Sequence, residues 1–527
     1  MKLLDGVDTL GGLLEIVRRV HGEKVALVVD DATLTYAELD LRSTQAAHAL
    51  ERDAMGAGDR IAVLGKGSLS SVSLMFGAAK ARAIYVPINS RLAPKEIAYI
   101  LAHAEPKLLM VDAECLDLLP RIAAEAGQLP KLLATVPNGV GLEVFDEWLE
   151  GTPSSMPSRS YAAEDAVVTL YTSGTTGHPK GVRLSSRSLL GVAQALRAAG
   201  DPWFGWNDRT VSMVSQPAFH IGGVWWLVQG LSQGSTNVLL RGFDAKQVLR
   251  IIPKYRVATT CMAPAMIQLL LLEPGCREVD FSSLRAINYG GSTCPTALLR
   301  EAMEVFGCGF CNAYGSTETG NVVVSLRPEE HLEASDQRLR AVGKPMPGVE
   351  VRILDENWED VGTGATGHIA VRSPSNMIDY WKNDEATRST LVDGWLMTGD
   401  AGFRDEEGYI HVSDRIRDMI ISAGEKIFPA EVENVIRTHP GVEDVAVIGV
   451  PDPLWGEAVR ALVVVAAGTA GTALRPGDII RYVRGRVGEY KVPRAVEFVE
   501  SLPRNAAGKI LKRELREPYW RGQDRRI

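Results

Sequence analysis

Residues 172–181 read TSGTTGHPKG and place four hydroxyl side chains, three glycines and one lysine within ten positions. Glycine lets a backbone turn tightly and approach a ligand closely, and exposed amides, hydroxyls and an ammonium group together can hold phosphate oxygens. The stretch is not a Walker A loop, because a proline precedes its lysine and a glycine follows it, whereas that motif requires Gly-Lys-Ser/Thr. The same composition also fits a plain surface turn between a strand at 166–171 and a helix capped by Ser185 or Ser186.

Residues 312–318 read NAYGSTE and combine an aromatic ring, hydroxyls and a carboxylate. Tyr314 offers a flat face to a base, Thr317 can donate to a phosphate oxygen, and Glu318 is an oxygen ligand suited to Mg²⁺ on a nucleotide. Taken singly, these residues have plainer interpretations, because a tyrosine is often buried in a core and a lone glutamate is usually a solvated surface group.

Each of two further segments ends in a charged residue that could contact a nucleotide. Residues 394–400 read GWLMTGD, and a carboxylate that follows a glycine turn, here Asp400, can accept both hydroxyls of a ribose. Residues 503–509 read PRNAAGK. Out of context, Lys509 at the end of that string would be interpreted as a solvated loop lysine.

The elements expected around these segments alternate between strands and helices. Short apolar runs separated by helical patterns recur at 24–112, where the first two strands form a hairpin, and again at 210–311. This alternation is typical of a mainly parallel sheet covered by helices, and short strands with glycine turns at 343–412 indicate a small β subdomain. We therefore predict an α/β protein with a large domain at 1–416, built on parallel-type β-α sheets, and a small mobile α+β domain at 417–527.

The string at 172–181 closely resembles the phosphate loop of the adenylate-forming enzymes, which include acyl-CoA synthetases, luciferases and peptide-synthetase adenylation domains. The string at 312–318 resembles the family's Tyr-Gly-x-Thr-Glu, and the one at 503–509 resembles the segment with its catalytic lysine. The motifs follow the family's order and span nearly the whole chain. The resemblance implies an ATP-dependent, AMP-forming acyl-CoA ligase that forms acyl-AMP from a carboxylic acid and then a thioester with CoA.

The resemblance also implies which group each residue would contact. The triphosphate would lie against Thr172, Ser173, Gly174, Thr175, Thr176, Gly177 and Lys180. The AMP moiety would lie against Gly290, Gly291, Ser292, Asn312, Ala313, Tyr314 and Gly315, with its ribose on Asp400 and Arg415. Mg²⁺ would lie near Glu318 and Thr176, while Thr317 and Lys509 would act on the reacting phosphate.

The acid would lie beside Phe219, His220, Trp225, Tyr289 and Gly290. A lone histidine in apolar surroundings is usually a core residue, but the family has an aromatic residue or a histidine at this position. The bulk of Phe219 and of the tryptophans at 225 and 226 favours a medium-chain or aryl acid over a very long fatty acid. Residues 218–220 carry no carboxylate, whereas domains that activate amino acids keep an Asp in this region, so an amino acid is disfavoured.

The path of the CoA thiol would follow Ala423, Gly424, Glu425 and Lys426, after a hinge at Arg417. Both regions depart from the family's pattern. The hinge is usually Asp or Lys, although Arg417 still offers a charged group that can face water. Ala423 replaces the first of two glycines and adds one methyl group beside the thiol path.

Two alternative functions remain open at this stage. One is an adenylating enzyme that loads the phosphopantetheine of a carrier protein in trans. No carrier domain is expected in the 18 residues that follow Lys509. The other is a nucleotide-binding protein that has lost catalysis, against which the presence of both Glu318 and Lys509 argues.

Composition excludes several classes of function. The net charge of −8 gives no basic face for a nucleic acid, and the charged residues among the first 20 positions favour an amphipathic helix over a secretory signal. No apolar run reaches the ~20 residues of a membrane span. Six scattered cysteines suit a reducing, cytoplasmic setting, and the C-x-x-C of Cys308 and Cys311 lacks the second pair that a zinc site would need. The oligomeric state is left open, and a homodimer is compatible with the sequence.

We predict that Lys509→Ala slows acyl-AMP formation by about 10²–10³-fold or more, because a preorganised charge stabiliser is removed. Thioester formation from supplied acyl-AMP and CoA should be nearly unchanged, since the small domain would carry Lys509 away for that step. The string around Lys509 resembles the site at which bacterial family members are inactivated by acetylation, which implies a lysine acetyltransferase as a partner acting on Lys509. Acetylation removes the charge and should copy the Ala variant. An equal loss of both half-reactions would show that Lys509 serves both steps or is structural.

Overall fold

The computed structural model describes most of the chain, in fourteen segments. They are residues 7–157, 159–172, 179–201, 206–292, 294–332, 334–415, 418–422, 425–452, 455–466, 474–484, 486–487, 489–504, 508 and 510–521. Of residues 414, 415, 425 and 426 only the backbone is described.

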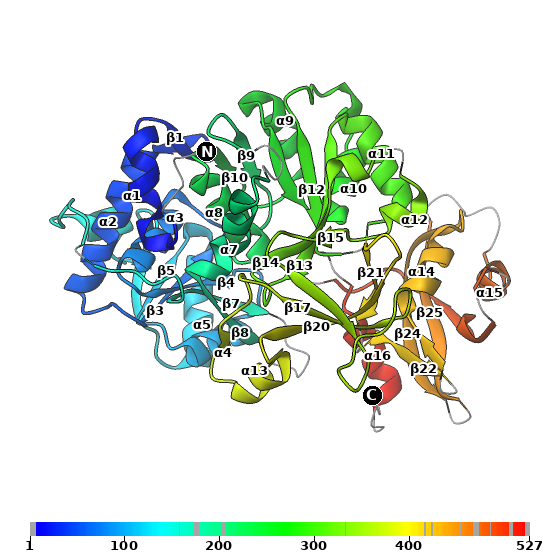
Figure 1. The fold of residues 1–527 in the computed structure, drawn as a ribbon. Helices are drawn as coiled ribbons and strands as arrows, with labels where there is room; N and C mark the ends of the chain where they lie inside the picture. Colours follow the sequence, from blue (N-terminus) through cyan, green and yellow to red (C-terminus); the bar gives the residue numbers. More distant parts are fainter. Residues whose placement is uncertain are drawn as a thin grey trace. The chain divides into compact units, whose positions relative to one another are not determined.

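Nine strands form the first sheet. Their order is β15 (Lys344–Pro345), β14 (Asn321–Leu326), β13 (Gly309–Ser316), β12 (Ala286–Gly290), β11 (Thr259–Met262), β9 (Val211–Val214), β10 (Thr236–Leu239), β1 (Val25–Val29) and β2 (Ala32–Thr35). The strands from β13 to β1 pair in parallel, and the pairs at both edges are antiparallel. Helices α9 (Ala245–Tyr255), α10 (Pro264–Leu272) and α11 (Thr296–Phe306) lie beside β12 (Figure 1) and share an apolar core with it.

Seven strands form the second sheet. Their order is β18 (Asp379–Tyr380), β8 (Lys180–Ser185), β7 (Ala166–Thr172), β4 (Ile84–Asn89), β3 (Arg60–Gly65), β5 (Leu108–Val111) and β6 (Lys131–Ala134). Pairing is parallel from β7 to β6 and antiparallel at β7–β8–β18. Helices α4 (Pro94–Ala104) and α5 (Leu119–Ala126) cover β3, β4 and β5. The predicted α/β class, with parallel-type β-α sheets, is therefore confirmed.

Local sequence signals explain where several elements begin. The hairpin predicted within 24–112 is formed by β1 and β2, whose turn residues Asp30 and Asp31 both have positive φ, at 47° and 69°. This is the conformation that tight two-residue hairpin turns require. Thr35 caps α2 (Tyr36–Arg52) in a capping box with Glu38. Ser185 caps α7 (Ser186–Ala198), which confirms the first of the two predicted capping residues, Ser185 and Ser186.

The remaining helices of the first part of the chain complete the layers around these sheets. They are α1 (Leu10–His21), α3 (Leu69–Lys80), α6 (Phe145–Leu149), α8 (Ile221–Ser232), α12 (Asp336–Leu339) and α13 (Asp384–Thr390). Buried Lys80 of α3 donates to Asp40 of α2 at 2.6 Å, and Arg18 of α1 pairs with the same carboxylate at 2.6 Å, so one buried acid links three helices.

Two smaller five-stranded sheets complete the fold. In one, the order is β16 (Glu350–Leu354), β17 (Gly367–Arg372), β20 (Trp395–Arg404) and β19 (Leu391–Val392), with β21 (Ile410–Arg415) on β20. In the other, it is β23 (Glu425–Ile427), β22 (Ile420–Ser422), β25 (Gly456–Val465) and β24 (Val442–Asp452), with β26 (Ala495–Phe498) on β25. Helices α14 (Pro429–Arg437) and α15 (Pro476–Val483) share a core with this last sheet, and α16 (Lys512–Trp520) packs on β24.

Contacts within the chain divide it into two compact units. The first unit comprises Met1–Leu339, Gly343–Glu350 and Val371–Leu396, and the second Arg340–Val342, Val351–Ala370 and Met397–Ile527. A functional boundary between 416 and 417 stays a prediction, because residues 416 and 417 lie outside the described segments. Within those segments, no helix is both long and apolar enough to cross a membrane.

Candidate functional site

The ends of the predicted phosphate loop are fixed by an antiparallel strand pair. Thr172, the last residue of β7, lies opposite Lys180, the first residue of β8. The two ends of the predicted loop are therefore held together by strand pairing. The residues Ser173, Gly174, Thr175, Thr176 and Gly177 lie outside the described residues. The ammonium nitrogen of Lys180 lies 4.9 Å from the ring centroid of Tyr380, the last residue of β18.

Glu318 is held in the turn between β13 and β14 at both its backbone and its side chain. Its carbonyl accepts from the backbone N–H of Met377 at 2.7 Å, and its Oε1 accepts from the phenol of Tyr380 at 3.0 Å. Buried Thr319 braces the turn, because its Oγ1 accepts from the N–H of Ser316 at 2.8 Å. Thr317 and Glu318 are half-buried here, so both remain accessible to a ligand.

The predicted nucleotide-lining residues of β12 and β13 are neighbours in the first sheet. The register places Tyr289 opposite Asn312 and Gly290 opposite Ala313, with Gly291 and Ser292 exposed just beyond the strand. A Cβ on Gly290 would lie 2.2 Å from the carbonyl oxygen of Ala313. The sheet itself therefore requires glycine at this position.

Gly315 has the same kind of explanation. A Cβ on it would lie 1.6 Å from the carbonyl oxygen of Asn321, at the bulge where the register of β13 and β14 shifts. Tyr314, immediately before this bulge, is half-buried. The glycine therefore lets β14 approach the strand that carries Tyr314, and stacking of a base on Tyr314 remains a prediction.

The segment predicted to contact the acid leads into α8. His220 occupies the N-cap position of α8, and its ring centroid lies 4.9 Å from that of buried Phe219. Burial, reinforced by the positive charge of Arg91, lowers the pKa of His220 to about 4. The imidazole is therefore neutral at physiological pH, and its buried Nε2 has no hydrogen-bond partner among the described residues.

The tryptophans and Tyr289 are core residues in this fold. Trp225 and Trp226 on α8 are 2% and 1% exposed, and the ring of Trp226 packs 4.5 Å from that of Trp206. Tyr289 is completely buried, and its phenol lies 3.0 Å from Nε2 of His331. The bulk of these side chains therefore fills the core. Trp225 and Tyr289 expose almost no side-chain surface, which gives no support to the prediction that they contact the acid.

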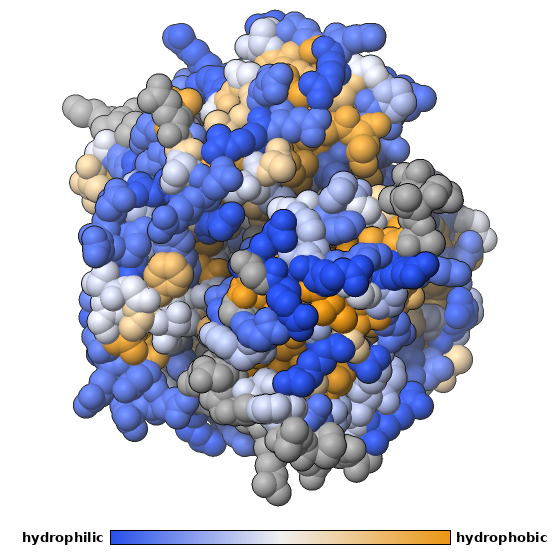
Figure 2. All heavy atoms as spheres, turned by 90° about the vertical axis from the view of Figure 1, so that its right-hand side faces the viewer, coloured by the Kyte–Doolittle hydropathy of each residue, from blue (hydrophilic) through white to orange (hydrophobic). Residues whose placement is uncertain are grey.

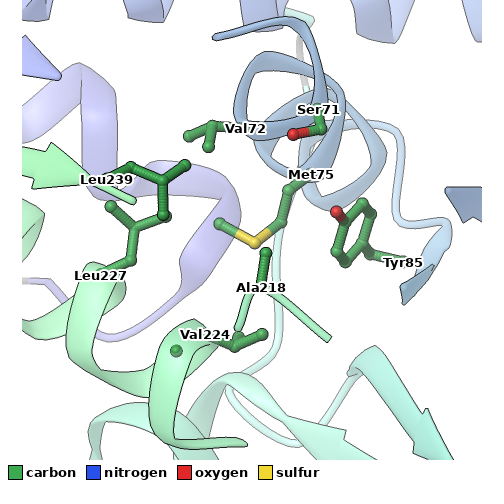
Figure 3. Close-up of a pocket in the computed structure, with 9 residues that line it drawn as sticks. Ser71, Val72, Met75, Tyr85, Ala218, Val224, Leu227 and Leu239 are labelled. Atoms are coloured by element: carbon green, nitrogen blue, oxygen red, sulfur yellow. The ribbon is translucent and has the colours of Figure 1, made fainter. Parts of the chain in front are cut away.

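An apolar pocket, which the sequence did not predict, lies beside the same segment. It is bounded by α3, β4, α8 and β10 (Figure 3). Its lining residues are Ser71, Val72, Met75, Tyr85, Ala218, Gly223, Val224, Leu227 and Leu239. Neither tryptophan lines it. The small residues at 218 and 223 are the only sequence signal that could have suggested it.

The second unit brings together the two residues predicted to hold the ribose. Asp400 of β20 lies directly opposite Arg415 of β21 in the antiparallel register. The glycine turn expected before Asp400 is instead part of the ten-residue strand β20, interrupted at Gly399 by a φ of 74°. The predicted CoA-path residues Glu425 and Lys426 lie in β23, paired with Ser422 and Ile421.

Besides the five loop residues 173–177, four more predicted site residues lie outside the described segments, namely Arg417, Ala423, Gly424 and Lys509. Conversely, sequence reasoning missed Tyr380. No motif marks it, because the contact that makes it part of the site crosses 62 positions to Glu318.

A magnesium ion fits this donor set only together with a nucleotide. Among the described residues, no group of three or more His, Cys, Asp or Glu side chains could hold a metal. Magnesium in nucleotide sites takes one or two protein carboxylates and completes its shell with phosphate oxygens and water. The single carboxylate of Glu318 suits that role, while Thr176 lies outside the described residues.

We predict that His220→Phe makes the protein less sensitive to acid. The pKa of His220 is about 4 when folded and about 6.5 when unfolded. Protons therefore bind the unfolded chain preferentially as pH falls from about 6.5, and stability is retained above that pH. Between about pH 7 and pH 4.5 the parent should lose about 2–3 kcal/mol more of its unfolding free energy than the variant, measured by chemical denaturation. Equal losses would contradict the burial of a neutral imidazole.

Comparison with known proteins agrees with this arrangement. The AMP-binding enzyme family matches residues 14–381, and the AMP-binding enzyme C-terminal domain matches residues 431–509. A fatty acid–[acyl-carrier-protein] ligase, ScoC of Streptomyces coeruleorubidus, is 39% identical over 503 residues, covering 95% of each chain. An indoleacetate–CoA ligase of Aromatoleum aromaticum is 33% identical and covers 98% of each chain.

The fold is also found in solved structures. The anthranilate CoA ligase AuaEII, in complex with anthranoyl-AMP, superimposes with a TM-score of 0.87 at 28% identity, covering 97% of each chain. Sequence family, architecture and the arrangement of motifs on the strands all agree. The chain therefore belongs to the AMP-binding enzymes of the adenylate-forming superfamily and is an acid–thiol ligase.

Proposed function

We propose that this acid–thiol ligase converts a medium-chain or aryl carboxylic acid into its CoA thioester through an acyl-AMP intermediate. A carboxylate oxygen attacks the α-phosphorus of ATP and pyrophosphate leaves. The CoA sulfur then attacks the acyl carbonyl, the thiol proton is released, and AMP leaves. The observation that carries the proposal is that Lys180 and Glu318, the two charged groups expected at the triphosphate, contact the same phenol of Tyr380.

Most of the protein's work in the first step is positioning and charge stabilisation. Lys180 would face the phosphates from one end of the β7–β8 hairpin, and Asp400 would accept the ribose hydroxyls from β20. Bound magnesium would supply Lewis-acid charge neutralisation of the phosphates, with Glu318 as its protein ligand. Because Lys180 and Asp400 belong to paired strands and Glu318 is held by Met377 and Tyr380, these groups need little reorganisation when ATP binds.

The class of acid is supported by the surroundings of His220. A neutral imidazole beside Phe219 gives an aromatic, uncharged wall with one hydrogen-bonding nitrogen. The relatives include ligases named for indoleacetate and anthranilate, which are aryl acids, and one named for fatty acids. A compact apolar or aryl acid suits such a wall better than an amino acid does.

A carrier-protein thiol is the second candidate acceptor, favoured by the similarity to ScoC over 95% of both chains. Holo carrier protein in place of CoA tests it directly. We also propose a reducing, cytoplasmic setting, since all six cysteines, each within the described segments, are free thiols.

We predict that octanoate and benzoate-type acids have a higher kcat/KM than hexadecanoate in CoA-dependent AMP release. One methylene group in an apolar pocket changes discrimination by about 1–3 kcal/mol, so a short pocket rejects long chains strongly. Pyrophosphate exchange with each acid, measured without CoA, separates selection during adenylation from selection during thioester formation. Equal or faster turnover of hexadecanoate would overturn the assignment of acid class, and no exchange with any acid would overturn the ligase chemistry proposed here.

A further inference from the structure

Tyr380 contacts both charged groups of the candidate phosphate site. Its ring is buried, its phenol donates to Oε1 of Glu318 at 3.0 Å, and Nζ of Lys180 lies 4.9 Å from its ring centroid. A ring face attracts a cation through its quadrupole, while a phenol hydrogen attracts a carboxylate. One neutral side chain thus satisfies two opposite charges at different places.

The position of Tyr380 is fixed by its neighbours in the chain. Asp379 forms a bidentate pair with Arg183, in which Nε donates at 2.6 Å. The backbone N–H of Trp381 donates to the carbonyl of Gly181 at 2.7 Å. Two guanidinium groups, those of Arg60 and Arg183, each lie 5.1 Å from the ring of Trp381, and its indole N–H donates to the carbonyl of His103 at 3.0 Å. The phenol therefore has little freedom to leave the site.

Lys180 and Glu318 do not form an ion pair with each other or with any other described residue. Without Tyr380 between them, two opposite charges in this half-buried site would pair directly, since the effective dielectric constant there is well below that of water. Such a pair would have to break before Lys180 could meet a phosphate and Glu318 a nucleotide-bound metal. Its strength would be subtracted from the affinity for ATP.

We propose that Tyr380 is a positioning residue that keeps Lys180 and Glu318 apart and oriented for metal-bound ATP. The proposal rests on the function proposed above. The hydroxyl aims the Glu318 carboxylate, and the ring holds the Lys180 ammonium without neutralising it. A purely structural tyrosine would support the fold equally well but would not couple these two charges.

Tyr380→Phe tests the hydroxyl alone, because the ring and its contact with Lys180 are kept. We measure equilibrium binding of ATP by calorimetry, with the acid omitted so that no turnover occurs, across a titration of MgCl₂. ATP affinity without metal should stay within about twofold of the parent, while the MgCl₂ concentration for half-maximal enhancement should rise about tenfold, as expected for loss of one bond to a charged group. Tyr255→Phe, at a phenol that also donates to a carboxylate, Asp31, is the matched control and should leave both values unchanged.

Tyr380→Leu tests the separation of the charges. Without the ring, Lys180 and Glu318 can pair, so metal-free ATP affinity should fall about tenfold, in line with a charged pair that must be broken. Adding Glu318→Gln to this variant removes the competing anion and should restore the metal-free affinity to within about twofold of the single Glu318→Gln variant.

Two results would overturn the proposal. One is a Tyr380→Phe variant whose MgCl₂ dependence matches the parent. The other is a Tyr380→Leu variant whose loss of affinity persists with Glu318→Gln, which would indicate a structural role. If Tyr380→Leu fails to fold, as judged by thermal unfolding, the Tyr380→Phe arm decides. A parent protein that binds no ATP would instead refute the proposed function, and this inference with it.

Discussion

The pairing of the two-residue strand β18 with β8 is the constraint on which the candidate site depends. It joins Asp379 to Arg183 across 196 positions of sequence. A strand this short forms few backbone hydrogen bonds, so the ion pair contributes much of the stability of its pairing with β8. A hydrogen bond to a charged group contributes about 1.5–3 kcal/mol. The same pairing sets Tyr380 beside the end of the phosphate hairpin. The geometry around Lys180 and Glu318 is thus fixed from a segment outside both motifs.

Two neutral side chains lie beside the residues proposed to contact the substrates. Tyr380 is a phenol between a cation and a carboxylate, and His220 is held uncharged by burial beside Phe219. Unpaired charges in a half-buried site cost free energy unless a ligand of opposite charge pairs with them, so they favour binding of such a ligand. This arrangement leaves Lys180 and Glu318 available to the nucleotide and metal that we propose to bind here.

Features that depend on local signals were predictable, and those that depend on tertiary pairing were not. The hairpin of β1 and β2 and the helix after Ser185 follow from turn and capping residues a few positions away. Tyr380 gave no such signal. Gly290 and Gly315 were predicted to lie against the AMP moiety, and the sequence did not reveal that a neighbouring backbone oxygen requires glycine at each of them. The tryptophans of α8 were expected at the acid, but a helix that is apolar on all sides is buried on all sides, and the sequence does not reveal which face borders a pocket.

The described motifs of the first unit share one structural origin, which is the carboxyl end of a strand with at least one parallel neighbour. The phosphate hairpin begins where β7 ends at Thr172, the glycine turn begins where β12 ends at Gly290, and Glu318 follows the end of β13 at Ser316. Ligands of open α/β sheets bind at such ends, because the chain must turn there and exposes backbone groups that the sheet no longer pairs. The strand ends fix the place of each motif, while the side chains decide its chemistry. A substitution that shifts β13 by one residue would therefore do more damage than the loss of any single contact, since it would turn Tyr314 to the other face of the sheet and move Glu318 away from Tyr380.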